Sequence, residues 1–324
     1  EYGFPESHAA SFALLVYASA WIKRHHPAHF AAALINSQPM GFYAPAQILR
    51  DAADHGVVVL PIDANCSQFD CTVDAHGRLR LGLRLIAGLP EAHVRALCAA
   101  RPQGGYPSVT ALWRSSRLPV SALRQLAQAD AFGSLGLDRQ RALWAVDELH
   151  DEPLPLFAHL DTALPDSTPP PAPTATPAST PALPRLSPAE QVVRDYRATG
   201  LSLKDHPVAF MRPALLGAGA RPCSFLRDPA CTHGTHLAVA GLVLLRQRPS
   251  TAKGVMFITL EDESGVANLI VHHHVYLRHR AAARHAGVLL ARGVVQRQGQ
   301  IVHLLVRSLR EMRAPLAVPS RDFR

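Results

Sequence analysis

Apolar residues recur at helical spacing in the first quarter of the chain. One face of the first predicted helix holds Phe12, Leu15, Val16, Ser19 and Ile22. Pro27 and Pro45 mark the start of two further helices, and Gly56 is suited to cap the end of the later one. The β-branched run 57–61, bounded by Gly and Pro, predicts a short strand.

The middle of the chain passes from a helical pattern to a biased composition. Residues 78–150 are typical of short helices broken by tight glycine turns. Residues 151–186 are rich in Pro, Ala, Ser and Thr, and cannot bury enough apolar surface to order themselves, which predicts a linker. Helical spacing resumes over 187–215, where Ser187 and Pro188 match a capped helix start.

Continuous or alternating apolar runs dominate residues 236–310 and predict five strands. The expected strands are 236–248, 255–261, 266–272, 288–296 and 301–308. A helix is expected at about 273–285, and turn residues occupy 262–265 and 297–299. Five strands with a helix after the third follow the order of an OB-fold barrel, which often binds single-stranded nucleic acid.

Positive charge is concentrated in two of these regions. The chain has a formal net charge of +8; residues 236–324 hold 13 Lys and Arg against 5 Asp and Glu, and residues 78–141 hold 10 against 3. Two basic modules favour a polyanionic partner, most simply nucleic acid. Solvated surface charge is the alternative.

Signatures of catalysis and of metal binding are missing from the sequence. The five cysteines are scattered without a C-x-x-C spacing, which argues against disulfides and structural zinc and fits a reducing cytoplasm. His272, His273 and His274 lie where a strand passes into a helix, so their side chains diverge and no metal site is predicted. Catalytic carboxylate pairs, a phosphate loop and nucleophile triads are also lacking. No signal peptide or membrane span is expected.

Two helix–hairpin–helix signatures lie in the basic segment 78–141. The first runs from Leu81 to Glu91, and a weaker second copy runs from Leu123 to Val146. Such hairpins direct backbone N–H groups and a helix N-terminus at a DNA phosphate, which gives salt-sensitive duplex binding without sequence preference. A plain helical hairpin in a core is the alternative. The DNA-binding candidates are Arg84, Gly88, Leu89, Gly133 and Arg139.

The predicted barrel has candidate DNA contacts of its own. Its first loop, 246–254, is basic, and Phe257 offers a stacking surface, although it fits the core equally well. With one aromatic residue available, binding would be mostly electrostatic. The candidates are Arg246, Arg248, Lys253, Phe257, Arg292 and Arg297.

A short apolar peptide, Pro153–Phe157, stands at the start of the predicted linker. Leu154, Leu156 and Phe157 suit docking into a partner's groove, with a cap on the preceding domain as the alternative.

Several strings in the chain together resemble one protein family. GFPESHAASFALLVYASAWIKRHHPAHFAAALINSQPMGFY (3–43) closely resembles the end of the fingers region of bacterial C-family DNA polymerases. The nearest kind is the damage-inducible, error-prone paralogue of the polymerase III alpha subunit. RLGLRLIAGLPEAHVRAL (80–97) resembles the helix–hairpin–helix domain of that family, GVMFITLEDESGVANLIV (254–271) its OB domain, and PSRDF (319–323) the C-terminus of its error-prone branch.

The resemblance implies roles for particular residues. Tyr2, Ser7 and His8 would lie near the incoming nucleotide, and Lys23 and Arg24 would face template or duplex phosphates. The catalytic aspartates of the family and their two Mg2+ ions belong to a palm domain that precedes this segment, so no catalytic residue and no cofactor is expected here.

The resemblance also bears on the short peptides. Residues 153–157 occupy the place of a sliding-clamp-binding peptide, but Pro153 stands where Gln is usual, which implies weak contact with the clamp. The similar string 128–132 lies in the second hairpin, and its Phe132 is expected to be buried.

These observations predict an α+β multidomain chain. Its expected parts are the C-terminal end of polymerase fingers (1–76), a tandem helix–hairpin–helix domain (77–150), a disordered Pro-rich linker (151–186), a helical connector (187–230), a five-stranded OB-fold barrel (231–313) and a tail (314–324).

The predicted function is that of the C-terminal DNA-binding portion of an error-prone DNA polymerase in translesion synthesis. The expected partners are duplex and single-stranded DNA, with dNTP for the parent enzyme and possible contacts with the sliding clamp and damage-inducible accessory proteins. The segment alone should be inactive, and its expected location is the cytoplasm. A non-catalytic DNA-binding or scaffold protein that keeps these modules is the alternative, as is an OB domain that binds protein.

Overall fold

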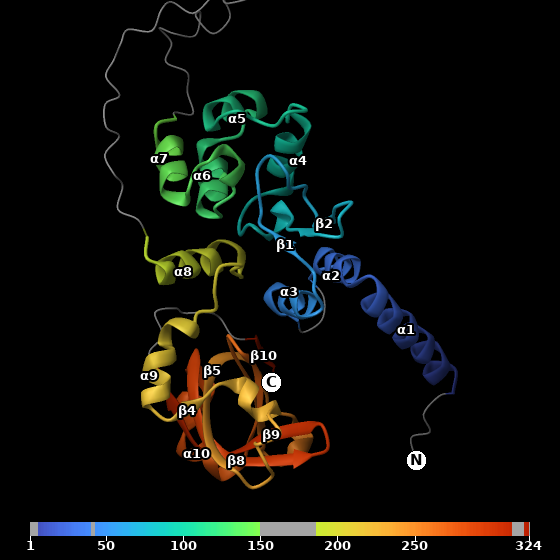
Figure 1. Cartoon of the computed structure of the whole chain (residues 1–324), viewed down its shortest axis with the longest axis vertical. Coiled ribbons are helices and arrows are strands. Elements are labelled where there is room, and N and C mark those ends of the chain that lie inside the picture. The colour runs from blue at the N-terminus through green and yellow to red at the C-terminus, as the bar shows by residue number, and fades with distance from the viewer. Residues whose placement is uncertain (1–5, 40–42, 150–185, 313–320, 324) are drawn as a thin grey trace, which may run out of the picture. The chain divides into compact units, whose positions relative to one another are not determined.

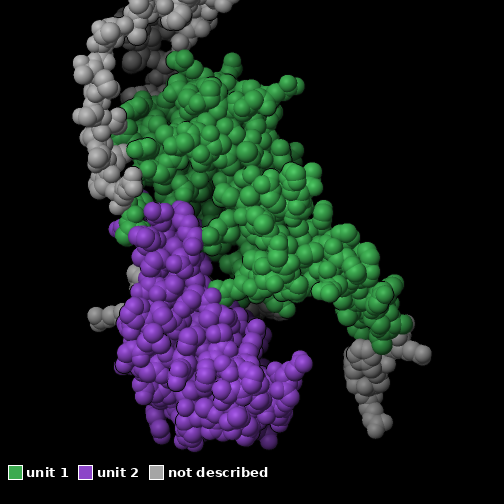
Figure 2. Space-filling model, in the orientation of Figure 1, with its two compact units in different colours: residues 1–187, 197–203 green, residues 188–196, 204–324 purple. Residues whose placement is uncertain are grey.

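The computed structural model describes residues 6–39, 43–149, 186–312 and 321–323. The chain divides into two compact units, residues 1–187 with 197–203 and residues 188–196 with 204–324 (Figure 2). Tyr2, the peptide 153–157 and nearly all of the predicted linker lie outside the described residues, and of Ser7 only the backbone is described. The predicted domain boundaries stay predictions.

Three helices begin the first unit (Figure 1): α1 (Glu6–His25), α2 (Pro27–Asn36) and α3 (Pro45–Asp54). Proline occupies the first turn of both α2 and α3, where its missing N–H removes no intrahelical hydrogen bond. Gly56 follows α3 with φ +83°, so the predicted glycine at the end of this helix is confirmed. The predicted strand at 57–61 contains β1 (Val59–Leu60).

A small sheet and a series of short helices complete the first unit. In the sheet, β1 pairs in parallel with β3 (Leu79–Arg80), and β2 (Thr72–Val73) pairs antiparallel with β3. The following elements are η1 (Leu83–Leu85), α4 (Glu91–Ala99), α5 (Val109–Ser116), α6 (Val120–Gln128), η2 (Gly133–Leu135) and α7 (Arg139–Asp147). The second predicted hairpin is therefore α6, η2 and α7.

The prediction of an α-helix before the first hairpin is wrong. The segment at Leu83 is a single 3-10 turn, η1. The N–H groups of Leu83 and Arg84 donate to Gln68 O at 2.9 Å and Phe69 O at 3.0 Å, so these backbone groups are bonded across to another loop and not along a helix.

The connector before the barrel is less helical than predicted. It contains α8 (Pro188–Thr199), η3 (Ala209–Met211), α9 (Arg212–Gly217), β4 (Ala220–Arg221) and η4 (Cys223–Arg227). Strand β4 corrects the expectation of helices alone, because it pairs in parallel with the first barrel strand.

The barrel has the predicted five strands with helices after the third. They are β5 (His236–Gln247), β6 (Met256–Asp262), β7 (Gly265–Val271), β8 (Val288–Gln298) and β9 (Ile301–Glu311). The pairing order β5-β6-β7-β9-β8 closes through β5 and β8, and β7 and β9 are parallel, which is the OB arrangement. The predicted helix at 273–285 forms as α10 (His273–Arg278) and α11 (Arg280–His285).

Burial on both faces explains the continuous apolar run of β5. Val239 and Val243 point into the barrel core, whereas Ala238, Ala240 and Leu242 belong to a second core that includes Leu215 of α9. Toward the C-terminal end of β5, β10 (Arg321–Phe323) pairs in parallel with Leu245–Gln247, so part of the predicted tail is a strand.

Candidate nucleic-acid interface

The second hairpin exposes a short loop between α6 and α7. Gly133, Ser134 and Gly136 are exposed, and Gly136 has φ +71°, a conformation that costs glycine little. Asp138 caps α7 by accepting a hydrogen bond from Arg141 N at 2.9 Å. The N–H groups of Ser134, Leu135, Gly136 and Leu137 are hydrogen-bonded within the first unit. The backbone N–H groups suited to contact phosphate are therefore those at the start of α7.

A buried carboxylate holds this loop from below. Asp63 is 6% exposed, and its Oδ2 accepts from Ser134 N at 2.9 Å while its Oδ1 accepts from Asn65 N at 2.8 Å. The N–H of Ala64 donates to Ala131 O at 2.7 Å, which adds a second tie to the same hairpin. The shape of the loop therefore depends on residues about seventy positions earlier in the chain.

Replacing Asp63 with alanine is expected to loosen the second hairpin. The Ser134 amide loses its acceptor, at a cost of about 1–3 kcal/mol for a buried hydrogen bond, so its hydrogen exchange should become about tenfold faster or more. Asp74→Ala is the matched control, because Asp74 also accepts from two backbone N–H groups in the first unit but sits in a different turn. Equal exchange rates at Ser134 in both variants would contradict this role of Asp63.

Some backbone groups of the first hairpin are hydrogen-bonded to other residues of the first unit. Ala87 N donates to Ala198 O at 2.8 Å, and Gly88 O accepts from Gln125 Nε2 at 3.0 Å. Gly88 is exposed with φ +75°, and Leu89 is half-buried. Because Ala87 N and Leu89 N also donate to protein carbonyls, this hairpin offers fewer backbone donors than its length suggests.

Two arginines proposed for the hairpins are held inside the first unit. Arg84 donates to Asn36 O and Gln38 O and pairs with Asp70 at 2.7 Å, so it joins the end of α2 to the loop before β2. Arg139 is 3% exposed and lies 3.9 Å from Asp130. Their positive charges are directed at protein groups and not at the surface. Phe132 is fully buried, as predicted.

Three arginines proposed for the barrel are also bound to backbone carbonyls. Arg246 is 4% exposed and donates to Ala283 O and Ala286 O. Arg297 donates to Leu226 O at 2.7 Å and Cys231 O at 3.0 Å, and Arg292 donates to Ala218 O at 2.9 Å. These contacts fix the barrel and leave less of each guanidinium for a ligand.

The remaining barrel candidates are exposed. Arg248 and Lys253 are exposed in the loop between β5 and β6, and Phe257 of β6 is 38% exposed. The guanidinium of Arg248 lies 4.5 Å from the centre of the Tyr276 ring, which orients it by a cation–π contact.

The candidates from the fingers-like segment lie on or near α1. The His8 ring packs at 4.3 Å from the Phe12 ring, and Arg24 is exposed. Lys23 is paired with Asp51 of α3 at 2.7 Å, so its charge is partly neutralised. The structure does not place a nucleotide site around them.

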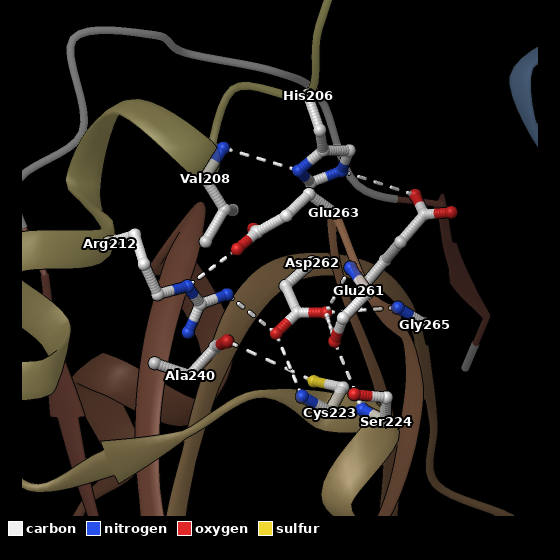
Figure 3. A network of polar contacts seen from close by, with 11 residues as sticks. His206, Val208, Arg212, Cys223, Ser224, Ala240, Glu261, Asp262, Glu263 and Gly265 are labelled. Atoms are coloured by element: carbon white, nitrogen blue, oxygen red, sulfur yellow. Dashed lines mark hydrogen bonds and ion pairs between the residues drawn. The ribbon is translucent and has the colours of Figure 1, made fainter.

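A network of buried charges in the second unit is the feature that the sequence did not reveal (Figure 3). Asp262 is fully buried and accepts from Arg212 at 2.7 Å and from Cys223 N at 2.8 Å. Glu263 also accepts from Arg212, at 2.5 Å. Both carboxylates had been expected to be simple turn residues; instead, they join α9 and η4 to the β6–β7 turn.

A buried histidine extends this network toward the connector. His206 is 7% exposed, its Nδ1 accepts from Val208 N at 3.2 Å, and its Nε2 lies 3.7 Å from a carboxylate oxygen of Glu261 (Figure 3). Since Nδ1 accepts, the proton of a neutral ring lies on Nε2 and faces Glu261. The cluster ties the connector to β6 without forming a nucleophile–base pair.

Nothing in the described part of the chain forms a metal centre. Among residues 6–39, 43–149, 186–312 and 321–323, no three His, Cys, Asp or Glu side chains gather as a metal site. Burial raises the pKa of the Cys71 and Cys223 thiols, which disfavours the thiolate form. No helix in the same residues is long and apolar enough to span a membrane.

The fold and these surfaces define a class of protein that pairs a helix–hairpin–helix domain with an OB barrel. The model of a helix-hairpin-helix motif family matches residues 56–142, which cover the first hairpin and the second as far as the first turn of α7. A solved asparaginyl-tRNA synthetase from Pyrococcus horikoshii aligns with 30% of the chain at 19% identity and a TM-score of 0.24, a likeness too slight to carry an argument.

Sequence relatives identify the particular family. The chain is 46% identical to "Error-prone DNA polymerase 1" of Agrobacterium fabrum and 47% identical to "Error-prone DNA polymerase 2" of Rhizobium meliloti, in both cases over 98% of its length. It is 44% identical to the "Error-prone DNA polymerase" of Sinorhizobium medicae over its whole length. Over nearly its whole length the chain is thus similar to proteins named error-prone DNA polymerase, which confirms the predicted resemblance. It spans 29–30% of the length of these relatives.

Proposed function

We propose that this chain is the DNA-holding portion of an error-prone DNA polymerase that acts in translesion synthesis. The observation that carries the proposal is the helix-hairpin-helix match over residues 56–142 inside a sequence 44–47% identical to error-prone polymerases. In this proposal the hairpins grip duplex phosphates and the barrel holds the single-stranded template.

The surface of α1 supports a place for the chain within a larger polymerase. This helix is apolar on every side, yet Leu14, Tyr17 and Trp21 are 69%, 71% and 47% exposed. A helix that is apolar all round is ordinarily buried. We propose that α1 packs against the remainder of the polymerase, with His8 and Ser7 at the edge of its nucleotide site.

The chemistry of nucleotide addition is proposed to lie elsewhere in the parent enzyme. Two Mg2+ ions need a cluster of oxygen ligands, and the described residues offer no such group. These residues therefore do not fit the metal ions, and the chain alone should not extend a primer in the presence of Mg2+ and dNTP. Primer extension by the isolated chain would refute this assignment.

Duplex binding by the hairpins is tested by placing a carboxylate at each hairpin. The double variant A87E/S134E adds one negative charge to an exposed position of each hairpin, and like-charge repulsion should weaken binding to a DNA duplex about tenfold at low salt. The control A99E/S115E adds the same charges at exposed positions of α4 and α5. Fluorescence anisotropy across a salt series measures both.

Each outcome of this titration bears on the proposal. A clear loss in A87E/S134E with little change in A99E/S115E supports contact through the hairpins. Equal losses would mean that only the overall charge matters. Absence of duplex binding by the unmodified chain at low salt would overturn the proposed grip.

A further inference from the structure

Charge on the barrel gathers around one edge. Between Ser264 and Arg310 the sequence contains no Asp or Glu but has seven Arg and six His. Arg278, Arg280 and Arg284 belong to α10 and α11, and none of them forms an ion pair with a carboxylate of the described residues. Uncompensated arginines on neighbouring helical turns create a local positive potential.

The basic loop after β5 lies against the start of these helices. A Cβ atom on Gly254 would come within 2.8 Å of His273 Nδ1, and Arg248 lies over Tyr276 of α10. The loop and the helices therefore form one continuous surface, which we call the helix-edge patch. It comprises Arg248, Lys253, His272, His273, His274, Arg278, Arg280, Arg284 and His285.

A buried arginine supports the helices of this patch from the inside. Arg246 reaches from β5 to the carbonyls of Ala283 and Ala286, at the C-terminal end of α11. A cation at this end also complements the helix dipole. The residue that the sequence suggested as a DNA contact instead anchors the helices that carry the exposed arginines.

The strand face around Phe257 lacks comparable charge. On β6 and β7 the outward residues near Phe257 are uncharged, and Thr259 and Asn268 hydrogen-bond to each other at 3.2 Å. On these two strands one partly exposed aromatic ring offers stacking, but their outward residues add little attraction for a phosphate backbone.

We propose that single-stranded DNA binds the barrel along the helix-edge patch, through its phosphates, and not across the strand face. This inference rests on the proposed DNA-holding function and locates its single-stranded site. Arg278, Arg280 and Arg284 contact successive phosphates, Arg248 and Lys253 continue the track, and the histidines add donors beside it.

The test compares two triple variants of the full chain with equal loss of charge. R278A/R280A/R284A removes three arginines from the patch, and R227A/R307A/R310A removes three exposed arginines elsewhere in the same unit. Binding of a fluorescent oligo(dT) is followed by anisotropy against salt. The patch variant should bind about tenfold more weakly at low salt, with a salt slope smaller by about 2, because each lost single-strand phosphate contact removes about 0.7. The control should lose less than about threefold.

Further measurements separate failure of this site from failure of the proposed function. Circular dichroism should match between the two variants, since five of the six side chains are exposed and Arg284 is only half-buried. Equal losses in both, or a larger loss in F257A than in the patch variant, would overturn the helix-edge site while leaving the DNA-holding function in place. Duplex binding should stay near the unmodified value in the patch variant. If the unmodified chain binds no oligo(dT) at low salt, both the proposed single-strand binding and the proposed site on the helix-edge patch are refuted.

Discussion

Replacing Asp262 with alanine is expected to lower the free energy of unfolding of the second unit by about 3–5 kcal/mol, the usual cost of removing one partner from a buried ion pair. Its Oδ1 accepts from Ser264 N, Ser264 Oγ and Gly265 N, and its Oδ2 accepts from Cys223 N and Arg212. The carboxylate is fully buried, so water cannot replace it without opening the β6–β7 turn. The variant leaves a buried N–H and a half-buried guanidinium short of partners.

The acid sensitivity of the unit should change with this substitution. Burial alone would raise the pKa of the Asp262 carboxyl, but hydrogen bonds from Ser264, Cys223 and Arg212 outweigh it, and the pKa lies below its ordinary value. A lowered folded-state pKa stabilises the fold above the unfolded value of about 3.9, and that stabilisation is lost as the pH falls through the folded pKa. The stability difference between the two proteins should therefore shrink below about pH 4.

Glu263→Ala is the matched control, because Glu263 pairs with the same Arg212 at 2.5 Å but is exposed. Its loss should cost about 0–1 kcal/mol, as for other surface pairs. Hydrogen exchange in β5–β9 is the suitable measurement, since all three tryptophans lie before residue 150 and report on the first unit. Equal costs for the two variants would refute the central place of Asp262.

The strands of the barrel could be predicted because their pattern is local. Apolar runs in 236–308, separated by glycine turns, determine both the strand positions and the OB order, and the structure follows them within a few residues. Burial on both faces of β5 even explains why that run does not alternate. The second hairpin, although the weaker of the two signals, could also be predicted, since the Asp138 cap of α7 lies within the same short segment.

The contacts that the arginine side chains make could not be predicted from the sequence. The sequence shows where each basic residue stands. Whether its side chain is exposed to water or hydrogen-bonded to a backbone carbonyl depends on residues far away in the sequence. Arg84 reaches Asn36 O, 48 positions away, and Arg297 reaches Leu226 O, 71 positions away. The excess of basic residues in the second unit therefore does not show which charged side chains can contact a ligand. The sequence made Arg246 and Arg297 candidates for DNA contact, but not Arg278, Arg280 and Arg284.

Contacts with residues distant in the sequence explain why two other expectations differ from the structure. A Cβ on Gly82 would lie 2.4 Å from Phe69 O, so the chain before the first hairpin packs flat against another loop and cannot wind into the predicted helix. Asp262 resembles a turn residue because its neighbours Ser264 and Gly265 are local, but two further partners come from α9 and η4, 50 and 39 positions earlier. Long-range partners leave no periodic signal in a sequence.

Gly293→Ala is expected to destabilise the barrel by about 3 kcal/mol or more, because an added methyl group would meet backbone and not a movable side chain. An ideal Cβ at this position lies 2.2 Å from Leu305 O and 2.9 Å from Leu305 C. The register between β8 and β9 shifts at this point, where Arg292 opposes Ser308 and Gly293 opposes Val306. The extra residue on β9 forms a bulge that brings its backbone onto Gly293.

The expected loss extends beyond the local contact because β8 closes the barrel. Its residues 288–294 pair with β5 on one side, while the same strand pairs with β9 on the other, so separating β8 from β9 opens the ring of strands. Gly217→Ala is the control: it ends α9, a Cβ there meets nothing within 4 Å, and alanine should be neutral or stabilise by about 0.5–1 kcal/mol. Hydrogen exchange of β5, β8 and β9 distinguishes the two. If G293A exchanges like G217A, the bulge is not a packing constraint, and the closure of the barrel must depend on its apolar core alone.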